Sequence, residues 1–120
     1  MRALFHACVT GSLEAVEFYR EAFKAEIKCR YVDSTGKFVE HAELAINGQT
    51  FLSVMEIQEA KPGNTMYFFF SFDDEKSINE AYEILKEGAE IRGAPGPCEW
   101  CRLLTDLTDK YGIRWLLNVF

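Results

Sequence analysis

Two cysteines near the carboxyl end, Cys98 and Cys101, have the Cys-x-x-Cys spacing of thiol redox proteins and zinc sites. A reactive pair normally lies at the N-terminus of a helix, where the dipole lowers the pKa of the thiol. Here the pair follows the turn sequence GAPGP and begins a predicted strand, and the charge of Glu99 would raise both thiol pKa values. A zinc site would need a second pair at suitable spacing, and Cys8 and Cys29 lie far away on what look like separate strands. Redox or zinc chemistry at Cys98 and Cys101 is therefore disfavoured.

The two histidines, His6 and His41, are the best candidates for proton transfer or metal binding. The segment FVEHAELAI alternates strictly between apolar and polar residues and predicts a half-buried strand. If Leu44 and Ile46 pack toward a helix, His41 and Glu43 share the opposite face and lie close enough to interact. A carboxylate beside an imidazole favours the protonated imidazole and could tune it as a base. For both histidines the alternative is a structural role in the sheet, which is the more frequent case.

The first half of the chain predicts the order strand, helix, strand, strand, strand. Residues 3–10 alternate as a strand, and residues 11–26 change to the helical period, with Ser12 as N-cap. The sequence STGK predicts a turn between the next two strands, and Asn47-Gly48 is the strongest hairpin signal in the chain. The apolar stripe of the helix is Leu13, Val16, Tyr19 and Phe23.

The element order restarts after Pro62-Gly63. The apolar run over residues 65–72 predicts a strand with both faces buried, and a helix follows over 73–88, capped by Asp73 or Asp74. GAPGP then predicts a turn, while CEWCRLL and IRWLLNVF predict the remaining strands. The segments KAEI and GAEI after the two helices echo each other, so the chain looks like a duplicated βαβββ module with a shortened second copy.

Length and charge limit the class of protein. A chain of 120 residues with 48% hydrophobic residues predicts one domain whose core needs no disulfides, and the four cysteines are expected to be reduced, as in a cytoplasmic protein. The net charge of −6 and the pI of about 4.9 argue against a nucleic-acid partner, because a phosphate-binding surface needs clustered Lys and Arg. No apolar run approaches membrane-spanning length and no signal-peptide pattern is present, so no membrane partner is expected.

Three separated motifs resemble one known family. They are AVEFYREAFKAEI after the first strand, HAELAINGQTFLSVME at mid-chain and DKYGIRWLLN at the end. They are similar to the vicinal-oxygen-chelate superfamily of glyoxalases, bleomycin resistance proteins and dioxygenases, and most of all to its PhnB-like branch. The resemblance implies an α+β fold, in which two βαβββ modules form a curved mixed sheet around a cup, with the helices packed outside. It also implies a homodimer and a single domain over 1–120, with modules at about 1–60 and 64–120.

Enzymes of that superfamily usually hold a divalent metal in the cup through His, Gln and Glu side chains. The resemblance places Leu4, Met66 and Leu116 at three of the four ligand positions, and the fourth position within 53–56. His6 lies two residues after Leu4, on the same face of the predicted strand. Leucine cannot bind a metal, and a thioether is a poor ligand for hard or borderline ions. We therefore expect no cofactor at the usual site. The alternative is a divalent metal at a displaced site, with ligands drawn from His6, His41, Glu43 and Glu56.

The resemblance and strand parity together select the residues that would face the cup. The last strand would direct Arg114, Leu116 and Asn118 inward, and Arg114 would meet an anionic ligand or pair with Glu43 or Glu56. Aromatic side chains with a few polar groups are typical of a small-molecule site. The candidate pocket residues are His6, His41, Glu43, Phe68, Phe70, Trp100, Arg114 and Asn118, with Met66 adding to the lining.

These residues favour a superfamily protein that binds a small organic ligand without the usual metal, or that catalyses an uncharacterised reaction. Bleomycin-resistance-like relatives act by binding and sequestering a small molecule without chemical conversion. The net negative charge of the chain suits a cationic ligand. The first alternative is a metal-dependent lyase or dioxygenase-like enzyme with a displaced site, and the second is a thiol redox protein. Some PhnB-like proteins carry the name of a methyltransferase of ubiquinone biosynthesis. Methyl transfer is disfavoured for this chain, because no glycine-rich cofactor loop follows a strand. Whether the protein is an enzyme stays open, and no residue is assigned a catalytic role.

Overall fold

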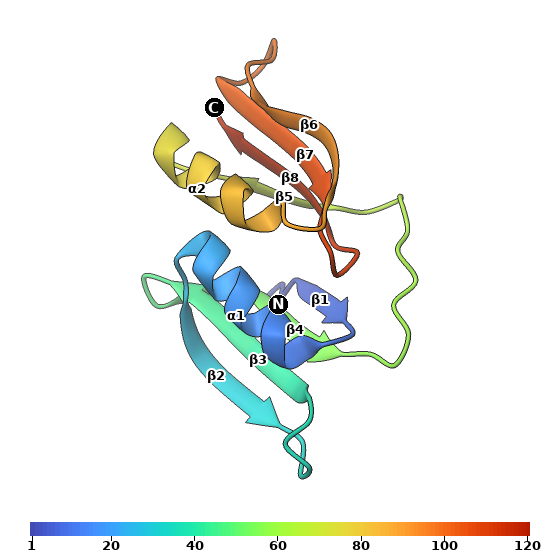
Figure 1. Cartoon of the computed structure of the whole chain (residues 1–120). Coiled ribbons are helices and arrows are strands. Elements are labelled where there is room, and N and C mark those ends of the chain that lie inside the picture. The colour runs from blue at the N-terminus through green and yellow to red at the C-terminus, as the bar shows by residue number, and fades with distance from the viewer. The chain divides into compact units, whose positions relative to one another are not determined.

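Each half of the chain is a four-stranded mixed sheet with one helix against one face (Figure 1). The structure is a computed structural model that describes all residues 1–120, and it divides into module 1 (Met1–Ala60) and module 2 (Lys61–Phe120). The strand order is β1-β4-β3-β2 in module 1 and β5-β8-β7-β6 in module 2, so the two sheets share one topology. The predicted α+β class and the pair of βαβββ modules are confirmed.

Module 1 follows the predicted order of elements. Ala7 and Val9 are fully buried while His6 and Cys8 take the other face of the strand, as the alternation predicts. The hairpin at Asn47-Gly48 is confirmed, with φ of 51° and 77°, which a type I′ turn requires. Its elements are β1 (His6–Val9), α1 (Ser12–Phe23), β2 (Glu26–Val32), β3 (Val39–Ile46) and β4 (Gln49–Glu56).

The start of α1 differs from the prediction. Ser12 is not the N-cap, because its Oγ accepts a hydrogen bond from the backbone N–H of Val39 at 2.7 Å. The cap is Glu56 at the end of β4, whose carboxylate accepts from the N–H groups of Gly11 at 3.2 Å and Ser12 at 2.9 Å. A carboxylate there is favoured by the helix dipole. Leu13 was also assigned wrongly to the buried stripe, since it is 40% exposed.

Module 2 is complete rather than shortened. The segment GAPG, predicted as a turn, forms the end of an edge strand, where proline is tolerated. The CEWC segment, predicted as strand, instead connects that strand to the next. Asp74 caps the helix as predicted, accepting from the N–H of Ser77 at 2.7 Å. The elements are β5 (Phe68–Ser71), α2 (Glu75–Leu85), β6 (Glu90–Gly96), β7 (Leu103–Thr108) and β8 (Arg114–Val119).

The apolar run around β5 is less buried than predicted. β5 is an edge strand of its sheet, and within it Phe69 is 48% exposed. Phe68 and Phe70 pack against the indole of Trp115, with ring centroids 5.1 Å and 5.4 Å away. Only the face toward Trp115 is therefore covered, and the continuous apolar run does not mark a strand buried on both faces.

The motif D-x-x-G-x-x-W near the end of the chain is a turn organised by Asp109. This buried carboxylate accepts from the N–H groups of Tyr111 at 2.8 Å and Ile113 at 3.0 Å, and from the indole N–H of Trp115 at 2.7 Å. Gly112, at φ 87°, closes the turn by donating its N–H to the Asp109 carbonyl at 2.9 Å. Trp115 is fully buried. The motif is thus explained by folding, because it anchors the largest core side chain.

Both helices are followed by a residue in the left-handed conformation at equivalent positions. Lys24 after α1 has φ 51°, and Gly88 after α2 has φ 69°. Each is followed directly by Ala-Glu-Ile, which leads into β2 or β6. The sequence echo of KAEI and GAEI therefore marks the same chain reversal in both modules.

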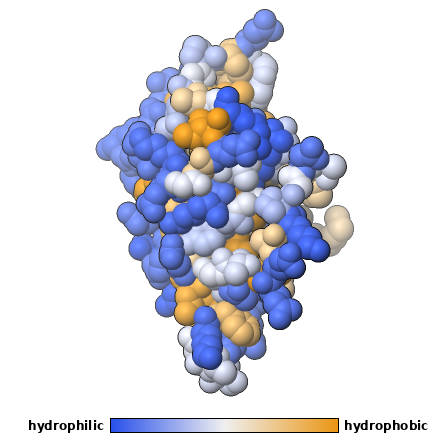
Figure 2. Space-filling view, turned by 45° about the vertical axis from the view of Figure 1, so that its right-hand side comes forward, coloured by the Kyte–Doolittle hydropathy of each residue, from blue (hydrophilic) through white to orange (hydrophobic).

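Hydrophilic side chains cover most of the surface visible in Figure 2, with smaller apolar patches between them. The large apolar side chains that stay exposed include Phe69, Trp100 and Phe120 of module 2. Neither helix, of 12 and 11 residues, has the length and apolar character needed to cross a membrane.

Candidate functional site

The sheet face of module 1 opposite α1 gathers polar side chains, and we call it the open face of module 1. The strand register places His6 beside Ser53 and Ser53 beside Glu43, while Glu43 lies beside Cys29 of β2. Residues paired in this way point to the same face of a sheet. His41 shares that face because it lies two residues from Glu43 on the same strand. The structure thus brings His6, His41 and Glu43 together, as strand alternation predicts.

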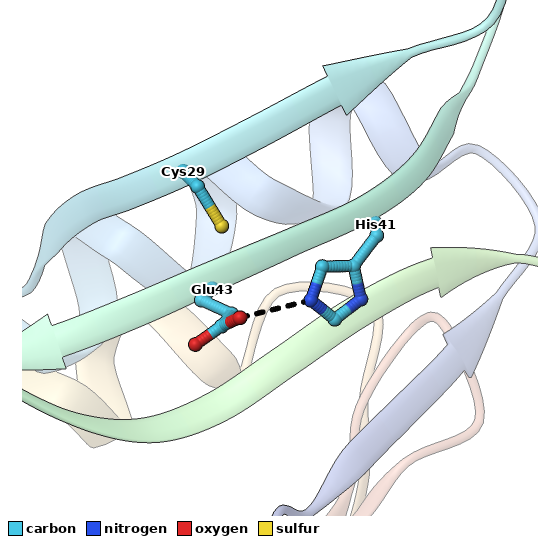
Figure 3. Close-up of side chains that lie close together, drawn as sticks. All are labelled: Cys29, His41 and Glu43. Atoms are coloured by element: carbon cyan, nitrogen blue, oxygen red, sulfur yellow. Dashed lines mark hydrogen bonds and ion pairs between the residues drawn. The ribbon is translucent and has the colours of Figure 1, made fainter.

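Two hydrogen-bonded pairs lie next to each other on this face. The Oγ of Ser53 is 2.8 Å from Nδ1 of His6. Nε2 of His41 is 3.0 Å from Oε2 of Glu43, as Figure 3 shows. The centroids of the two imidazole rings are 5.8 Å apart. Thr50 donates its hydroxyl to the other carboxylate oxygen of Glu43 at 3.0 Å. Each ionisable group is therefore held in a defined orientation.

Hydrogen bonds make Glu43 an anion over a wide pH range. The hydrogen bond with His41, and then that from Thr50, hold the pKa of the Glu43 carboxyl below its ordinary value. Burial and the charge of Glu43 raise the pKa of the Cys29 thiol, so Cys29 is a protonated thiol at neutral pH. A carboxylate flanked by imidazoles can accept hydrogen bonds from a ligand, balance a positive group or take part in proton transfer.

Cys29 and Thr50 of this cluster were not predicted from the sequence, and Ser53 was predicted only as one end of the segment expected to hold the fourth ligand. The Cys29 sulfur lies within 4.8 Å of the metal-binding atoms of both His41 and Glu43 (Figure 3). The side chains of Cys29, His41 and Glu43 are half-buried. Small polar residues and a lone cysteine carry no local signal for a site. Their part in it follows only from the register of three strands.

Glu56, predicted as an alternative metal ligand, takes no part in this cluster. It is the register partner of Val9, which faces α1, so its carboxylate lies on the other side of the sheet. Burial raises the pKa of Glu56, but the hydrogen bonds from Ser12 and Gly11 outweigh that effect and leave the pKa below its ordinary value. Glu56 serves the helix, and the predicted ligand set loses one member.

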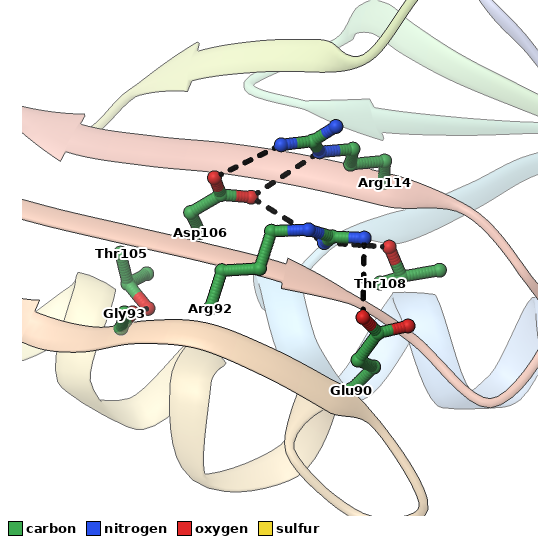
Figure 4. A network of polar contacts seen from close by, with 7 residues as sticks. All are labelled: Glu90, Arg92, Gly93, Thr105, Asp106, Thr108 and Arg114. Carbon is green, nitrogen blue, oxygen red and sulfur yellow. Dashed lines mark hydrogen bonds and ion pairs between the residues drawn. The ribbon is translucent and has the colours of Figure 1, made fainter. Parts of the chain in front are cut away.

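Arg114 forms an ion pair with Asp106 on the neighbouring strand, a partner that the sequence did not indicate. Its Nη2 lies 3.2 Å from Oδ2 of Asp106, and its guanidinium stacks 3.9 Å from the ring centre of Tyr67. Arg92 approaches the same carboxylate at 3.7 Å and donates to Thr108 at 2.8 Å (Figure 4). The hydrogen bond to Asp106 raises the pKa of Arg114 further. The positive charges of Arg92 and Arg114 are thus largely neutralised by nearby carboxylates of module 2, chiefly that of Asp106.

The side-chain directions predicted for β5 were wrong. Phe68 and Phe70 point to the side of the buried Trp115, so neither lies on the opposite face with Arg114. Phe69 takes that face instead, as register partner of Leu116. The residues that face each side of β5 are shifted by one position from the expected alternation. A run of aromatic residues contains no polar residue that could indicate which side chains face which side of the sheet.

Asn118 and Trp100 lie in different surroundings. Asn118 is fully buried, and its side-chain oxygen accepts from the hydroxyl of Ser71 at 2.7 Å. Trp100 is 52% exposed, and its ring packs 6.0 Å from that of Phe69 and 5.9 Å from that of Phe120. Asn118 is therefore closed off by its neighbours, while Trp100 belongs to an aromatic cluster at the surface.

The residues at the usual metal positions of the resembled superfamily do not fit a metal ion. Leu4 precedes β1, and Met66 precedes β5 with its side chain 81% exposed. Leu116 lies in β8 beside Phe69. On β4, the Ser53 hydroxyl is engaged by His6. Leu4, Met66 and Leu116 offer neither a carboxylate nor an imidazole, and the Glu56 carboxylate at the end of β4 is hydrogen-bonded to the start of α1, so a metal ion at the usual positions would lack an adequate set of ligands.

Each module also has a shallow hollow of its own. In module 1 a hollow of about 420 Å³ is bordered by Thr50, the hydroxyl that orients Glu43, and by Arg2 and Lys28. In module 2 a hollow of about 400 Å³ lies by Arg92 and Thr108. Both volumes are at the low end of those that hold small ligands.

The sequence profile of the Glyoxalase/Bleomycin resistance protein/Dioxygenase superfamily matches residues 6–117. The chain belongs to this superfamily. The predicted resemblance is thereby confirmed, and no curated protein matches the chain.

Three solved structures share the fold. Protein PA1353 from Pseudomonas aeruginosa has a TM-score of 0.82 at 15% identity, covering 99% of this chain and 97% of that one. A Bacillus cereus PhnB protein, whose name carries a provisional 3-demethylubiquinone-9 3-methyltransferase assignment, has a TM-score of 0.80 at 22% identity, with 100% of both chains covered. The fosfomycin resistance protein FosX from Listeria monocytogenes, solved with Mn(II) and 1S,2S-dihydroxypropylphosphonic acid, has a TM-score of 0.71 at 18% identity, covering 98% and 90%. Identities this low establish the common fold alone.

Proposed function

We propose that this glyoxalase-superfamily chain binds a small polar organic ligand on the open face of module 1, without a metal at the usual positions. One observation carries the proposal. The His41–Glu43 pair, at 3.0 Å, lies beside the His6–Ser53 pair, at 2.8 Å, and the imidazole rings are 5.8 Å apart. A few precisely placed polar groups fix the orientation of a small ligand in its site.

The surroundings of Glu43 indicate the ligand chemistry. Its carboxylate would accept hydrogen bonds from hydroxyl or amino groups of the ligand, and Tyr31, whose ring lies 6.4 Å from that of His41, would add an aromatic surface. The nearby hollow is bordered by Thr50, Arg2 and Lys28. Two cationic side chains at this border argue against the purely cationic ligand that the net charge of the chain suggests. A ligand with both donor and acidic groups matches the site better.

The superfamily supports a small-molecule ligand in general terms. Its member FosX has been solved with a small phosphonic acid. That complex also contains Mn(II), whereas the residues of this chain at the corresponding positions offer no adequate donor set. We therefore infer binding, with or without conversion of the ligand, rather than the metal-dependent chemistry of such relatives.

Native mass spectrometry of freshly purified protein tests this function. We expect a co-purified small molecule on the wild-type chain, and its loss or weakening in Glu43→Gln and His41→Ala, because each change removes a polar group that orients it. Glu40→Gln is the matched control, since Glu40 lies on the same strand but is exposed and outside the cluster. The same spectrum reports whether the chain is the predicted homodimer, at twice the 13.8 kDa subunit mass.

Equal retention in the Glu43→Gln and Glu40→Gln variants would contradict the assigned site. A wild-type chain that carries nothing is then screened against a library of polar metabolites by thermal shift. Complete absence of stabilisation in that screen would contradict the function itself.

A divalent metal on the open face of module 1 is the second candidate. The observation that favours it is the convergence of Cys29, His41 and Glu43, whose donor atoms all lie within 4.8 Å. Thiolate, imidazole and carboxylate together suit Zn²⁺, which would retain an open position for a substrate. Cys29 would have to lose its proton, and the raised pKa of that thiol makes binding strengthen as the pH rises.

Titration of metal-free protein with Co²⁺ separates the two candidates. A displaced metal site predicts one ion per chain, with the absorption typical of thiolate ligation, and loss of that absorption in Cys29→Ser but not in Cys8→Ser. Cys8 is the matched control, because it lies on β1 at the other edge of the sheet from β2. Retention of the organic ligand after chelator treatment supports the metal-free proposal.

A further inference from the structure

Cys98 and Cys101 flank a turn between β6 and β7 and hold their sulfur atoms in contact. The backbone N–H of Cys98 donates to the carbonyl of Cys101 at 3.2 Å, so Glu99 and Trp100 form the tip of the turn. The two Sγ atoms are 2.9 Å apart, although both residues are free thiols. Residues three apart in a turn have the Cα separation that a disulfide needs, so a bond requires only a small movement of the side chains.

The two thiols differ in their surroundings. Cys98 is half-buried, whereas Cys101 is only 8% exposed and its thiol lies 3.4 Å from the Leu103 carbonyl. Burial raises the pKa of Cys98, but hydrogen bonds from the Cys101 thiol and from the backbone of Trp100 and Cys101 outweigh this and leave the pKa lowered. Burial and the hydrogen bond with Cys98 raise the pKa of Cys101. One accessible, more acidic thiol beside one protected thiol is the arrangement of an attacking and a resolving cysteine.

The other cysteines cannot substitute for this pair. Cys8 lies on β1 and Cys29 on β2, which are the two edges of the module 1 sheet. Three strand spacings separate them, about 14 Å, which is beyond the reach of a disulfide. Cys98 and Cys101 are thus the pair in contact. They lie in a turn rather than on the predicted strand, and the pKa of Cys98 is lowered although the charge of Glu99 opposes this, so two of the reasons for disfavouring the pair do not hold in the structure.

We propose that Cys98 and Cys101 form a reversible disulfide by exchange with a low-molecular-weight disulfide. The Cys98 thiolate attacks one sulfur of that disulfide, forms a mixed disulfide and releases one thiolate, which takes up the proton that Cys98 gave up. Cys101 then loses its proton and attacks the Cys98 sulfur, which releases the second small thiol. Both cysteines are oxidised, and the small disulfide is reduced to two thiols.

The bond would constrain a group of exposed aromatic side chains. Trp100, at the tip of the turn, packs against Phe69 of β5 and against the C-terminal Phe120, and these three residues are 52%, 48% and 63% exposed. A covalent bridge across the turn limits the positions open to Trp100. The oxidation state of the pair therefore controls the shape of this aromatic surface, and the fluorescence of Trp100 should report it.

The test equilibrates reduced full-length protein with mixtures of reduced and oxidised glutathione, followed by alkylation of free thiols and intact mass measurement. We expect a monomer species that has lost two hydrogens and carries two fewer alkyl groups, its fraction rising with the oxidised share. Full recovery of both thiols on return to reduced glutathione establishes reversibility. The Cys8→Ser/Cys29→Ser double variant should behave in the same way.

Single variants assign the roles of the two thiols. Cys101→Ser should accumulate a glutathione adduct on Cys98, because nothing resolves it, whereas Cys98→Ser should stay largely unmodified. The fluorescence change on oxidation should be absent in Trp100→Phe, which retains the buried Trp115.

Three outcomes would overturn the proposal. The first is complete alkylation of wild-type protein at every glutathione ratio, and the second is a disulfide that links two chains. The third is a stable adduct on Cys101 in Cys98→Ser without one on Cys98 in Cys101→Ser, which would reverse the order of attack. The first two concern the wild-type chain and do not depend on whether a variant folds.

Discussion

Glu56 caps a helix because the chain brings the end of β4 to the start of α1. Its carboxylate accepts from Gly11 and Ser12, and those N–H groups would otherwise lack a partner within the helix. Asp109 has a similar structural role in module 2, where its carboxylate accepts hydrogen bonds from two backbone N–H groups and from the indole N–H of Trp115. At the scale of single residues, these two acidic groups serve the fold, while Glu43 stays available on an open face.

Replacement of Glu56 by alanine should lower the free energy of unfolding by about 1–2 kcal/mol, because it removes the cap and its interaction with the helix dipole. Glu56→Gln retains an acceptor oxygen and should lose less. Urea unfolding followed by circular dichroism measures both. Glu59→Ala is the control, since Glu59 is exposed and should change stability by less than about 0.5 kcal/mol. A Glu56→Ala variant as stable as the control would mean that Glu56 has another role.

At the scale of elements, the ends of the helices show how two modules of different sequence reach the same topology. Each helix must reverse into an edge strand, and the reversal uses one residue at positive φ. Module 2 has Gly88 there, which adopts this conformation without strain, whereas module 1 has Lys24. The same reversal therefore costs module 1 more conformational energy.

Lys24→Gly should raise the free energy of unfolding by up to about 1 kcal/mol, because a left-handed non-glycine residue costs about 1–2 kcal/mol and the greater chain entropy of glycine offsets part of the gain. Gly88→Ala should lower it by more than about 1 kcal/mol, since the new Cβ would also lie 3.1 Å from Cβ of Lys110. Thermal and urea unfolding measure both changes.

Gly63→Ala is the matched control for the glycine substitution, because Gly63 has nothing within 4 Å of an added Cβ and no positive φ. Gly63→Ala should leave stability close to that of the wild type. If Gly88→Ala were as well tolerated as Gly63→Ala, the left-handed conformation at this reversal would not be required.

At the scale of the whole molecule, stability depends on carboxylates spread over module 1. Glu17, Asp33, Glu43 and Glu56 all have lowered pKa values, because each accepts hydrogen bonds in the folded state. The pKa of Asp33 falls from 3.8 to about 2, chiefly through the Thr35 hydroxyl and the backbone N–H groups of the same loop. The unfolded chain binds more protons than the folded one in this range, so stability rises with pH.

The protein should therefore be most stable above a pH of about 5 and should lose stability progressively down to a pH of about 2. The loss starts as the unfolded carboxylates, with ordinary pKa values of 3.8 for Asp and 4.5 for Glu, take up protons before the folded ones. Urea unfolding at several pH values measures this dependence. Asp33→Ala should flatten the low-pH end of the curve, and a wild-type stability that does not change across this range would contradict the assigned pKa directions.

Local pattern was enough to predict most elements and the superfamily. The alternation over residues 38–46, the helical periods, the Asn47-Gly48 turn and the Asp74 cap all depend on residues within a few positions of each other. The same holds for the shared face of His41 and Glu43, since two residues on one strand need no partner to define it. β6 was missed because Gly and Pro favour turns locally, and only its place at the sheet edge makes them acceptable.

Tertiary structure decided which residues meet. The Asn47-Gly48 turn alone would pair Glu43 with Leu52, but a bulge between Leu44 and Ala45 shifts the register and brings Ser53 opposite Glu43. A one-residue shift moves each side chain to the other face of a sheet, and no local pattern announces it. The Glu56 cap, the Cys29–His41–Glu43 cluster and the phase of β5 likewise depend on segments far apart in the chain. The sequence by itself determined the modules and the family, while the site depended on strand register, because register is set by long-range pairing.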